Sequence, residues 1–147
     1  MLAQAEAEAA VARICAQFEA LSPASLPALG ALYADNAGFK DPFNQVRGRE
    51  AVLGIFRHMF DNLDGPRFVV HERIVQGPQV FLVWDFRFRM RRWREGEQCI
   101  RGGSHLRLDA AGRIEDHRDY WDAAEELYEK LPAIGALMRW LRKRAAS

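Results

Sequence analysis

Three features that would assign a protein to a class at once are scarce in this sequence. It has two cysteines in 147 residues, Cys15 and Cys99, and their positions match no metal-binding or redox spacing. A disulfide framework is therefore excluded, and we expect two free thiols. No apolar run reaches the length of a membrane-spanning helix. The formal net charge is only +1, from 21 basic and 20 acidic residues, which leaves no electrostatic footprint for nucleic acid.

Recognition motifs are equally scarce. The sequence contains no phosphate-cradling glycine loop, no nucleophile elbow and no metal-ligand cluster, so we expect neither a metal nor a cofactor. Its first residues, MLAQAEAEAAVARICAQF, lack the basic head and apolar core of a signal peptide, and we expect a cytoplasmic protein. The length fits one domain over 1–147.

What the sequence does contain is a change of hydrophobic period. Apolar residues recur at three- and four-residue steps over 3–21 and 48–63, which predicts two helices. A shorter helix between them includes Leu32 and Tyr33 in its apolar stripe, and AGFKD (37–41) reads as a short strand. The period then becomes two, which predicts strands over 67–76, 79–93, 98–109 and 113–121. Helices followed by an antiparallel meander predict an α+β fold.

The long strands predict which side chains face the core. A hairpin centred on Gly96 pairs even positions with even positions, for example Phe86 with Leu106. Apolar side chains then share one face and arginines the other. Ser104 becomes a lone hydroxyl on the inner face, and Asp85 faces outward beside an arginine. A hairpin one residue longer or shorter would exchange the two faces.

The stretch AGFKDPFNQVRG places one carboxylate, Asp41, between Phe39 and Phe43 and directly before Pro42. In an apolar cavity, desolvation would disfavour the charged form and suit the carboxylate to general acid–base catalysis. An aspartate before proline also often caps a turn through its own side chain. Both readings stay open for Asp41.

A second candidate cluster lies on the last predicted strand. His117, Asp119 and Trp121 alternate, so they share one strand face. If that face is the inner one, the imidazole and the carboxylate can act together or activate a water. The alternative is an ion-paired strand, since Arg118 is adjacent in sequence. Asp41 and Asp119 could also divide acid and base roles if their surroundings differ.

The C-terminal region carries two further patterns. Asp122-Ala-Ala-Glu125 is similar to a capping box and predicts the start of a final helix. Residues 131–144 form a basic amphipathic pattern. Such a helix packs on its own domain or on a partner subunit more often than on a membrane surface.

The segments YADNAGFKDP and VRGREAVLGIFRHMF resemble the nuclear-transport-factor-2-like (NTF2-like) superfamily. This group includes ketosteroid isomerases, SnoaL-type polyketide cyclases and limonene epoxide hydrolases. The likeness covers roughly residues 5–122, which leaves 123–147 as a C-terminal helical extension. It implies a cone-shaped α+β barrel, in which a strongly bent antiparallel sheet wraps around helices and encloses a deep apolar pocket. It also implies a homodimer formed through the outer sheet face.

The resemblance carries over only in part. In ketosteroid isomerases the aspartate of the DP element, here Asp41, is the general base. The position of the acidic oxyanion donor is Ser104 here, and the tyrosine donor of the first helix falls near Ile14, which cannot donate. The RDY element is similar to the closing strand of limonene epoxide hydrolases, whose first aspartate is catalytic; here that is Asp119. The arginine that those hydrolases carry on the long strand is replaced by Val83.

We therefore expect a cofactor-independent acid–base enzyme of isomerase, cyclase or hydrolase type that acts on a small apolar carbonyl or epoxide compound. Asp41 is the predicted main base, and His117 and Asp119 assist. The predicted substrate contacts are Ser104, Trp121, Phe39, Phe43, Trp84, Phe86, Phe88 and Phe56. The alternative is a non-catalytic domain that binds a lipophilic ligand or serves as a dimeric scaffold, because the fold alone cannot decide.

Overall fold

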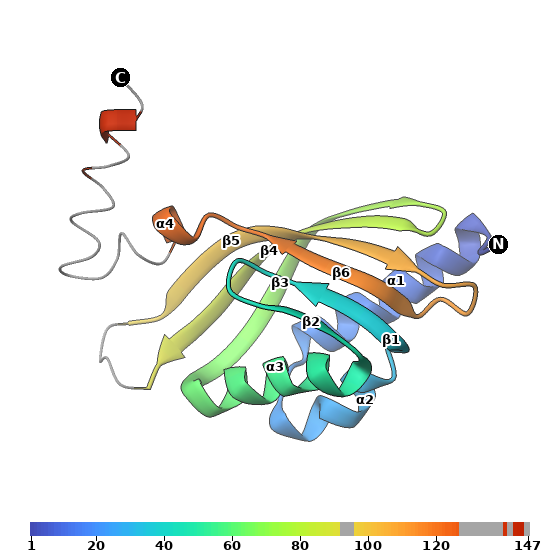
Figure 1. Cartoon of the computed structure of the whole chain (residues 1–147), viewed down its shortest axis with the longest axis horizontal. Helices are drawn as coiled ribbons and strands as arrows, with labels where there is room; N and C mark the ends of the chain where they lie inside the picture. Colours follow the sequence, from blue (N-terminus) through green and yellow to red (C-terminus); the bar gives the residue numbers. More distant parts are fainter. Residues whose placement is uncertain (92–95, 127–139, 141–142, 146–147) are drawn as a thin grey trace.

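The structure, a computed structural model, describes residues 1–91, 96–126, 140 and 143–145 (Figure 1). Its helical elements are α1 (Gln4–Glu19), the 3-10 turn η1 (Pro23–Ser25), α2 (Leu26–Gly30), α3 (Arg49–Asn62) and α4 (Ala123–Glu126). Its strands are β1 (Tyr33–Lys40), β2 (Gln45–Arg47), β3 (Leu63–Gln76), β4 (Gln79–Met90), β5 (Gln98–Leu108) and β6 (Ile114–Tyr120).

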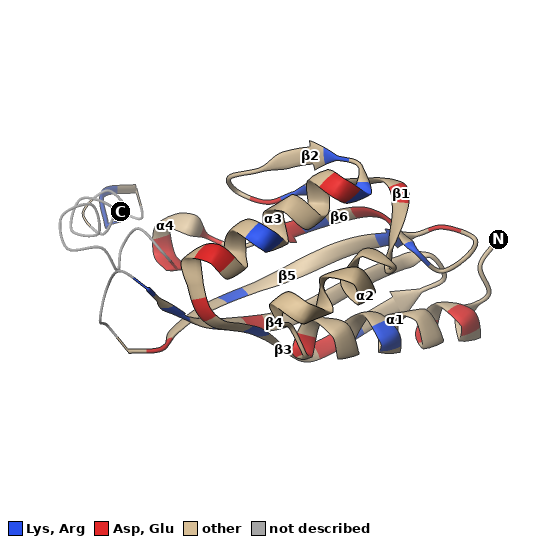
Figure 2. Cartoon of the chain, turned by 90° about the horizontal axis from the view of Figure 1, so that it is seen from below, with Lys and Arg blue, Asp and Glu red and all other residues tan. Residues whose placement is uncertain are grey.

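The strands form one six-stranded sheet in the order β2-β1-β6-β5-β4-β3. Helices α1, α2 and α3 lie together on one side of this sheet, as Figures 1 and 2 show from two directions. The α+β class and the cone-shaped arrangement predicted from the sequence are confirmed. The sheet is open and mixed rather than purely antiparallel, because β1 pairs with β6 in the parallel direction. The long intervening chain allows this pairing, which a meander of sequence neighbours cannot produce.

The helices cover the sheet with the apolar stripes that the sequence predicts. Helix α1 buries residues at three- and four-residue steps, among them Val11, Ile14 and Phe18. Helix α3 does the same with Val52, Leu53, Phe56 and Phe60. Each fully buried side chain of this size stabilises the fold by about 1.5–3 kcal/mol. The core therefore lies between these two helices and the concave face of the sheet.

The faces of the long strands are as predicted, but their register is not. Phe86 pairs with Ile100 rather than with Leu106, so the strand partner lies six residues earlier. Because the shift is even, the same side chains remain on the inner face. Ser104 is buried on the inner face. Asp85 faces outward, with its carboxylate 3.0 Å from His71 Nε2.

The structure corrects one local prediction, for Tyr33, and confirms another, for Asp122. Tyr33 begins β1 instead of ending a helix, because α2 stops at Gly30 and the chain extends immediately afterwards. Asp122 caps α4, since its Oδ1 accepts a hydrogen bond from the Glu125 N–H at 3.1 Å.

The amphipathic pattern over 131–144 lies outside the described residues, apart from 140 and 143–144. Within the described part of the chain, no helix has the length and apolar character needed to cross a bilayer.

Candidate functional site

A cavity of about 420 Å³ lies between the inner face of the sheet and helices α1 and α3. Its wall is mostly aromatic and aliphatic. Every residue predicted to contact a substrate lines it, as do the three predicted catalytic residues: Ser104, Trp121, Phe39, Phe43, Trp84, Phe86, Phe88, Phe56, Asp41, His117 and Asp119. Few polar atoms therefore face the cavity, and these atoms determine which chemistry the cavity can support.

The exposure of the lining residues shows where the cavity opens. Phe43 and Asn44, in the turn between β1 and β2, are exposed, and so are His58 and Asn62 near the end of α3. On the sheet side, Ser104, Trp84 and His117 are buried. The mouth consequently lies between the 41–44 turn and the C-terminal half of α3.

A chain of hydrogen bonds crosses the inner wall. The Trp84 indole N–H donates to Ser104 Oγ at 2.9 Å, and the Ser104 hydroxyl donates to Asp119 Oδ1 at 2.5 Å. His117 Nε2 lies 2.7 Å from the same Asp119 oxygen. The Tyr33 hydroxyl lies 2.8 Å from His117 Nδ1. The strand register explains this gathering, because Asp119 pairs with Ser104 across β5 and β6.

The protons in this chain can be assigned from chemistry. An ionised carboxylate only accepts, so His117 Nε2 carries a hydrogen and donates it to Asp119. In the neutral imidazole Nδ1 is then an acceptor, and the Tyr33 hydroxyl donates to it. Every donor in the chain is thus directed toward Asp119.

Burial fixes the outer member of this chain. Tyr33 is fully buried, and desolvation raises the pKa of its hydroxyl well above the ordinary value; the negative charge of Asp119 raises that pKa further. Tyr33 therefore remains a neutral donor. The His117 ring is held between Tyr33, whose ring is parallel to it within 4°, and Phe39, whose centroid lies 4.7 Å away. The imidazole can neither turn nor leave its two partners without disturbing the core.

The two oxygens of Asp119, which lines the cavity, differ in their partners. Its Oδ1 accepts from Ser104 and His117, whereas no side chain among the described residues donates to Oδ2. The Asp119 side chain is only 13% exposed. A positioned carboxylate oxygen in an apolar cavity is suited to accept a proton from a carbon acid or from water.

Asp41 has different partners. Its Oδ1 accepts from the backbone N–H groups of Phe43 at 2.8 Å and Asn44 at 2.6 Å. The Asn44 side-chain amide lies 3.1 Å from both Asp41 oxygens. These contacts are those of the turn-capping alternative, in a side chain that also lines the cavity. No hydrogen bond or ion pair links Asp41 to His117 or Asp119 within the described residues.

Tyr33 is the member of the site that sequence reasoning missed. It was assigned to a helical stripe, yet it is buried at the start of β1, as Ala37 and Phe39 are further along the strand. Counting back from Phe39 in steps of two passes Asp35, which is exposed, and the pairing of β1 with β6 shifts register between Tyr33 and Gly38. Strand alternation therefore gave no clear signal for Tyr33, and the neighbouring leucines favoured a helix.

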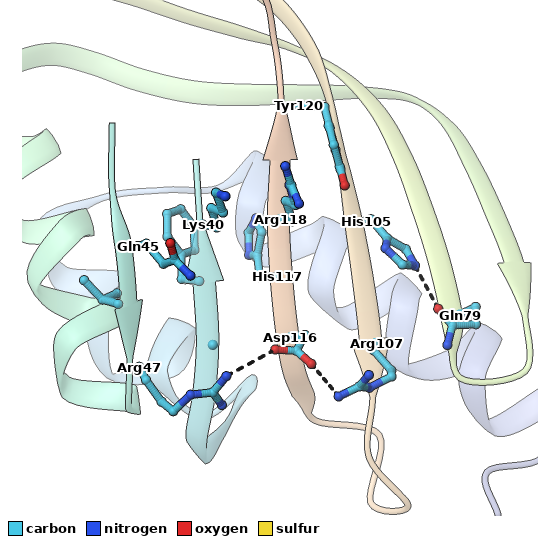
Figure 3. Close-up of a pocket in the computed structure, with 13 residues that line it drawn as sticks. Lys40, Gln45, Arg47, Gln79, His105, Arg107, Asp116, His117, Arg118 and Tyr120 are labelled. Carbon is cyan, nitrogen blue, oxygen red and sulfur yellow. Dashed lines mark hydrogen bonds and ion pairs between the residues drawn. The ribbon is translucent and has the colours of Figure 1, made fainter. Parts of the chain in front are cut away.

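A second groove, of about 370 Å³, lies on the outer face of the sheet and is mainly polar (Figure 3). In it Asp116 pairs with both Arg47 and Arg107, and His105 Nε2 lies 2.8 Å from Gln79 Oε1. These contacts satisfy much of its charge. This is the face through which a homodimer was expected, and that expectation stays a prediction. Over the described residues, no three His, Cys, Asp or Glu side chains group into a metal site.

Comparison with solved structures supports the fold. A protein with a ketosteroid isomerase-like fold from Catenulispora acidiphila DSM 44928, in complex with trimethylamine, is 17% identical with a TM-score of 0.70, over 80% of this chain and 88% of that chain. An LEH-like epoxide hydrolase from M. tuberculosis is 18% identical with a TM-score of 0.68, over 84% and 87%. An NTF2-like protein of unknown function from Burkholderia pseudomallei K96243 is 20% identical with a TM-score of 0.69, over 81% and 92%.

At these identities the similarities show that the fold is shared, but they do not show that an activity is shared. No curated protein matches the sequence. A family model does match: the SnoaL-like domain, over residues 14–117, which is more than half of the chain and runs from α1 to His117 in the candidate site. The chain belongs to the family of SnoaL-like domains.

Proposed function

We propose that this protein is a cofactor-independent proton-transfer enzyme, of isomerase or cyclase type, that acts on a small apolar carbonyl compound with Asp119 as its base. One observation carries the proposal. Asp119 Oδ1 is held by Ser104 and His117, while Oδ2 has no donor among the described side chains and the residue lines an apolar cavity.

The reaction follows from that arrangement. Asp119 Oδ2 takes a proton from the carbon next to the substrate carbonyl; the C–H electron pair moves into the carbon–carbon bond and the carbonyl oxygen becomes an enolate oxygen. The protonated Asp119 then returns the proton to the same carbon or to a conjugated one, which gives exchange or isomerisation. Ser104 and His117 hold the carboxylate in position through both steps.

The lining also limits which carbonyl compounds suit the site. The Ser104 hydroxyl and the Trp84 N–H are already used within the hydrogen-bond chain. A missing oxyanion donor typically costs a factor of about 10²–10³ in rate. The substrates expected are therefore carbon acids that are acidic already, such as aryl-activated or β,γ-unsaturated ketones.

Epoxide hydrolysis is the second candidate. It is favoured by the position of Asp119 in the RDY element and by the fold shared with an epoxide hydrolase at 18% identity. Asp119 would then activate a water, and a separate acid would have to protonate the epoxide oxygen. Asp41 is the other carboxylate on the cavity wall, but its oxygens accept hydrogen bonds within the 41–44 turn. A single base that shuttles one proton fits the geometry better.

The test is hydrogen–deuterium exchange at the α-carbon of 2-tetralone in D₂O, followed by NMR above the buffer rate. Wild type is expected to accelerate exchange, and Asp119→Asn to lose about 10²–10⁴-fold of that acceleration. Asp61→Asn, an exposed aspartate of α3, is the matched control and should keep it. Equal exchange by wild type and Asp119→Asn would overturn the proposal. Tetralone binding without exchange would favour the non-catalytic binder.

A further inference from the structure

The mouth of the cavity carries an aromatic pair. Phe43 is 52% exposed, which is unusual for so large an apolar side chain, and its ring meets Trp121 edge to face, with centroids 5.5 Å apart and planes at 72°. Trp121 follows directly after β6, two residues beyond Asp119. Both rings line the cavity. The aromatic pair and the proposed base therefore stand on neighbouring parts of one wall.

The turn that carries Phe43 is held by Asp41. The Asp41 carboxylate accepts from the backbone N–H of Phe43 and of Asn44 and from the Asn44 amide, while the Asp41 N–H donates to the Asn44 carbonyl at 2.9 Å. Pro42 further restricts the backbone. Without the carboxylate, the two backbone N–H groups would have to bind water instead. The turn would then no longer fix the orientation of the Phe43 ring.

Two rings inclined to each other present both a face and an edge to an entering molecule. A flat aromatic ring can meet both in the offset or edge-to-face geometries that aromatic groups prefer, and it buries the exposed part of Phe43 in doing so. A puckered saturated ring of the same carbon number has no quadrupole and touches the pair less closely. The pair can therefore distinguish substrates by flatness.

We propose that Phe43 and Trp121 form an aromatic clamp at the cavity mouth that selects flat, aryl-bearing carbonyl substrates, and that Asp41 is a positioning residue that holds this clamp. The inference rests on the proposed function for the carbonyl and deepens it by naming the substrate class. It gives Asp41 a role that requires no proton transfer.

Equilibrium binding of two ketones with one carbon skeleton tests the clamp. By isothermal titration calorimetry, wild type should bind 2-tetralone, which contains an aromatic ring, more tightly than 2-decalone, which is saturated. Phe43→Leu should reduce that preference by about two- to twelve-fold, the worth of one aromatic contact. Phe43→Tyr, which keeps the ring, should retain it. Tyr120→Leu is the matched control, because Tyr120 is a 47% exposed aromatic residue on the outer groove. An unchanged preference in Phe43→Leu would overturn the clamp.

The role of Asp41 is tested by a pair of substitutions. Asp41→Ala removes the acceptor and should lower the tetralone preference as Phe43→Leu does. Asp41→Asn keeps an acceptor oxygen for the same N–H groups and should retain the preference. Retention in both variants would contradict the positioning role.

The outcome for the clamp can be separated from the outcome for the proposed reaction. Binding preference needs no proton transfer, so Asp119→Asn should show the wild-type preference while it loses exchange. If wild type catalyses no exchange but its preference for 2-tetralone depends on Phe43, the result would support the clamp and contradict the proposed enzymatic function.

Discussion

The carboxylates of Asp41 and Asp119 line the same cavity but are bound by different kinds of donor. Asp119 is held by two side chains of a buried network, and one of its oxygens accepts from no described side chain. Asp41 is held by the backbone and side chain of its own turn at the mouth. The comparison teaches that residue type and position in a pocket do not assign a base; the remaining acceptor capacity does.

The largest expected difference between the two regions is in stability. His117→Ala removes the partner of the buried Tyr33 hydroxyl and leaves space beside Phe39, so it should lower the free energy of unfolding by about 3–5 kcal/mol. Asp41→Ala, in an exposed turn, should cost about 1 kcal/mol. Urea denaturation of both variants checks the comparison. Equal losses would mean that the network around Asp119 is no more constrained than the turn.

The stability of the protein at alkaline pH tests the buried network through Tyr33. Its pKa in the folded protein lies above the ordinary value of 10.0, because burial and Asp119 disfavour the phenolate. Above pH 10 the unfolded chain loses this proton and the folded one keeps it, so the unfolding free energy falls by up to about 1.4 kcal/mol per pH unit. Tyr33→Phe should be less stable than wild type near pH 8 and show a shallower alkaline decline. Parallel declines in the two proteins would contradict the assignment of Tyr33 as the buried donor.

A smaller effect is expected on the Asp41 side. Asp41→Asn keeps the turn acceptor, so its melting temperature should lie within about 2 °C of wild type, as for a change of a few tenths of a kcal/mol. Differential scanning calorimetry at neutral pH is sufficient. A melting temperature clearly above that of wild type would indicate an unpaired carboxylate under strain, as a catalytic Asp41 would require.

Much of this site could be predicted from the sequence because side chains alternate between the two faces of a strand. The inner position of Ser104 followed from the parity of β4 and β5, and the shared face of His117 and Asp119 followed from their spacing of two. The prediction for Ser104 was correct despite a register error of six residues between β4 and β5, since an even shift leaves the faces unchanged. The same parity placed Asp85 outside, which left it out of the cavity.

The rest depended on contacts between distant segments. Tyr33 reaches His117 only because β1 pairs with β6 in parallel, across most of the chain, and local propensity carries no signal of that pairing. The turn around Asp41 was one of two alternatives, and only the distances to Phe43 and Asn44 distinguish them. A periodic pattern predicts which face a residue occupies, but not which partner it meets there.

The central claim is that Asp119, and not Asp41, moves the proton. The most direct measurement is the rate of α-proton exchange of 2-tetralone by Asp119→Asn and Asp41→Asn, each at saturating ketone and with binding confirmed separately. The account predicts that Asp119→Asn loses exchange by about 10²-fold or more, while Asp41→Asn stays within about threefold of wild type. Loss of exchange in Asp41→Asn with retention in Asp119→Asn would contradict it.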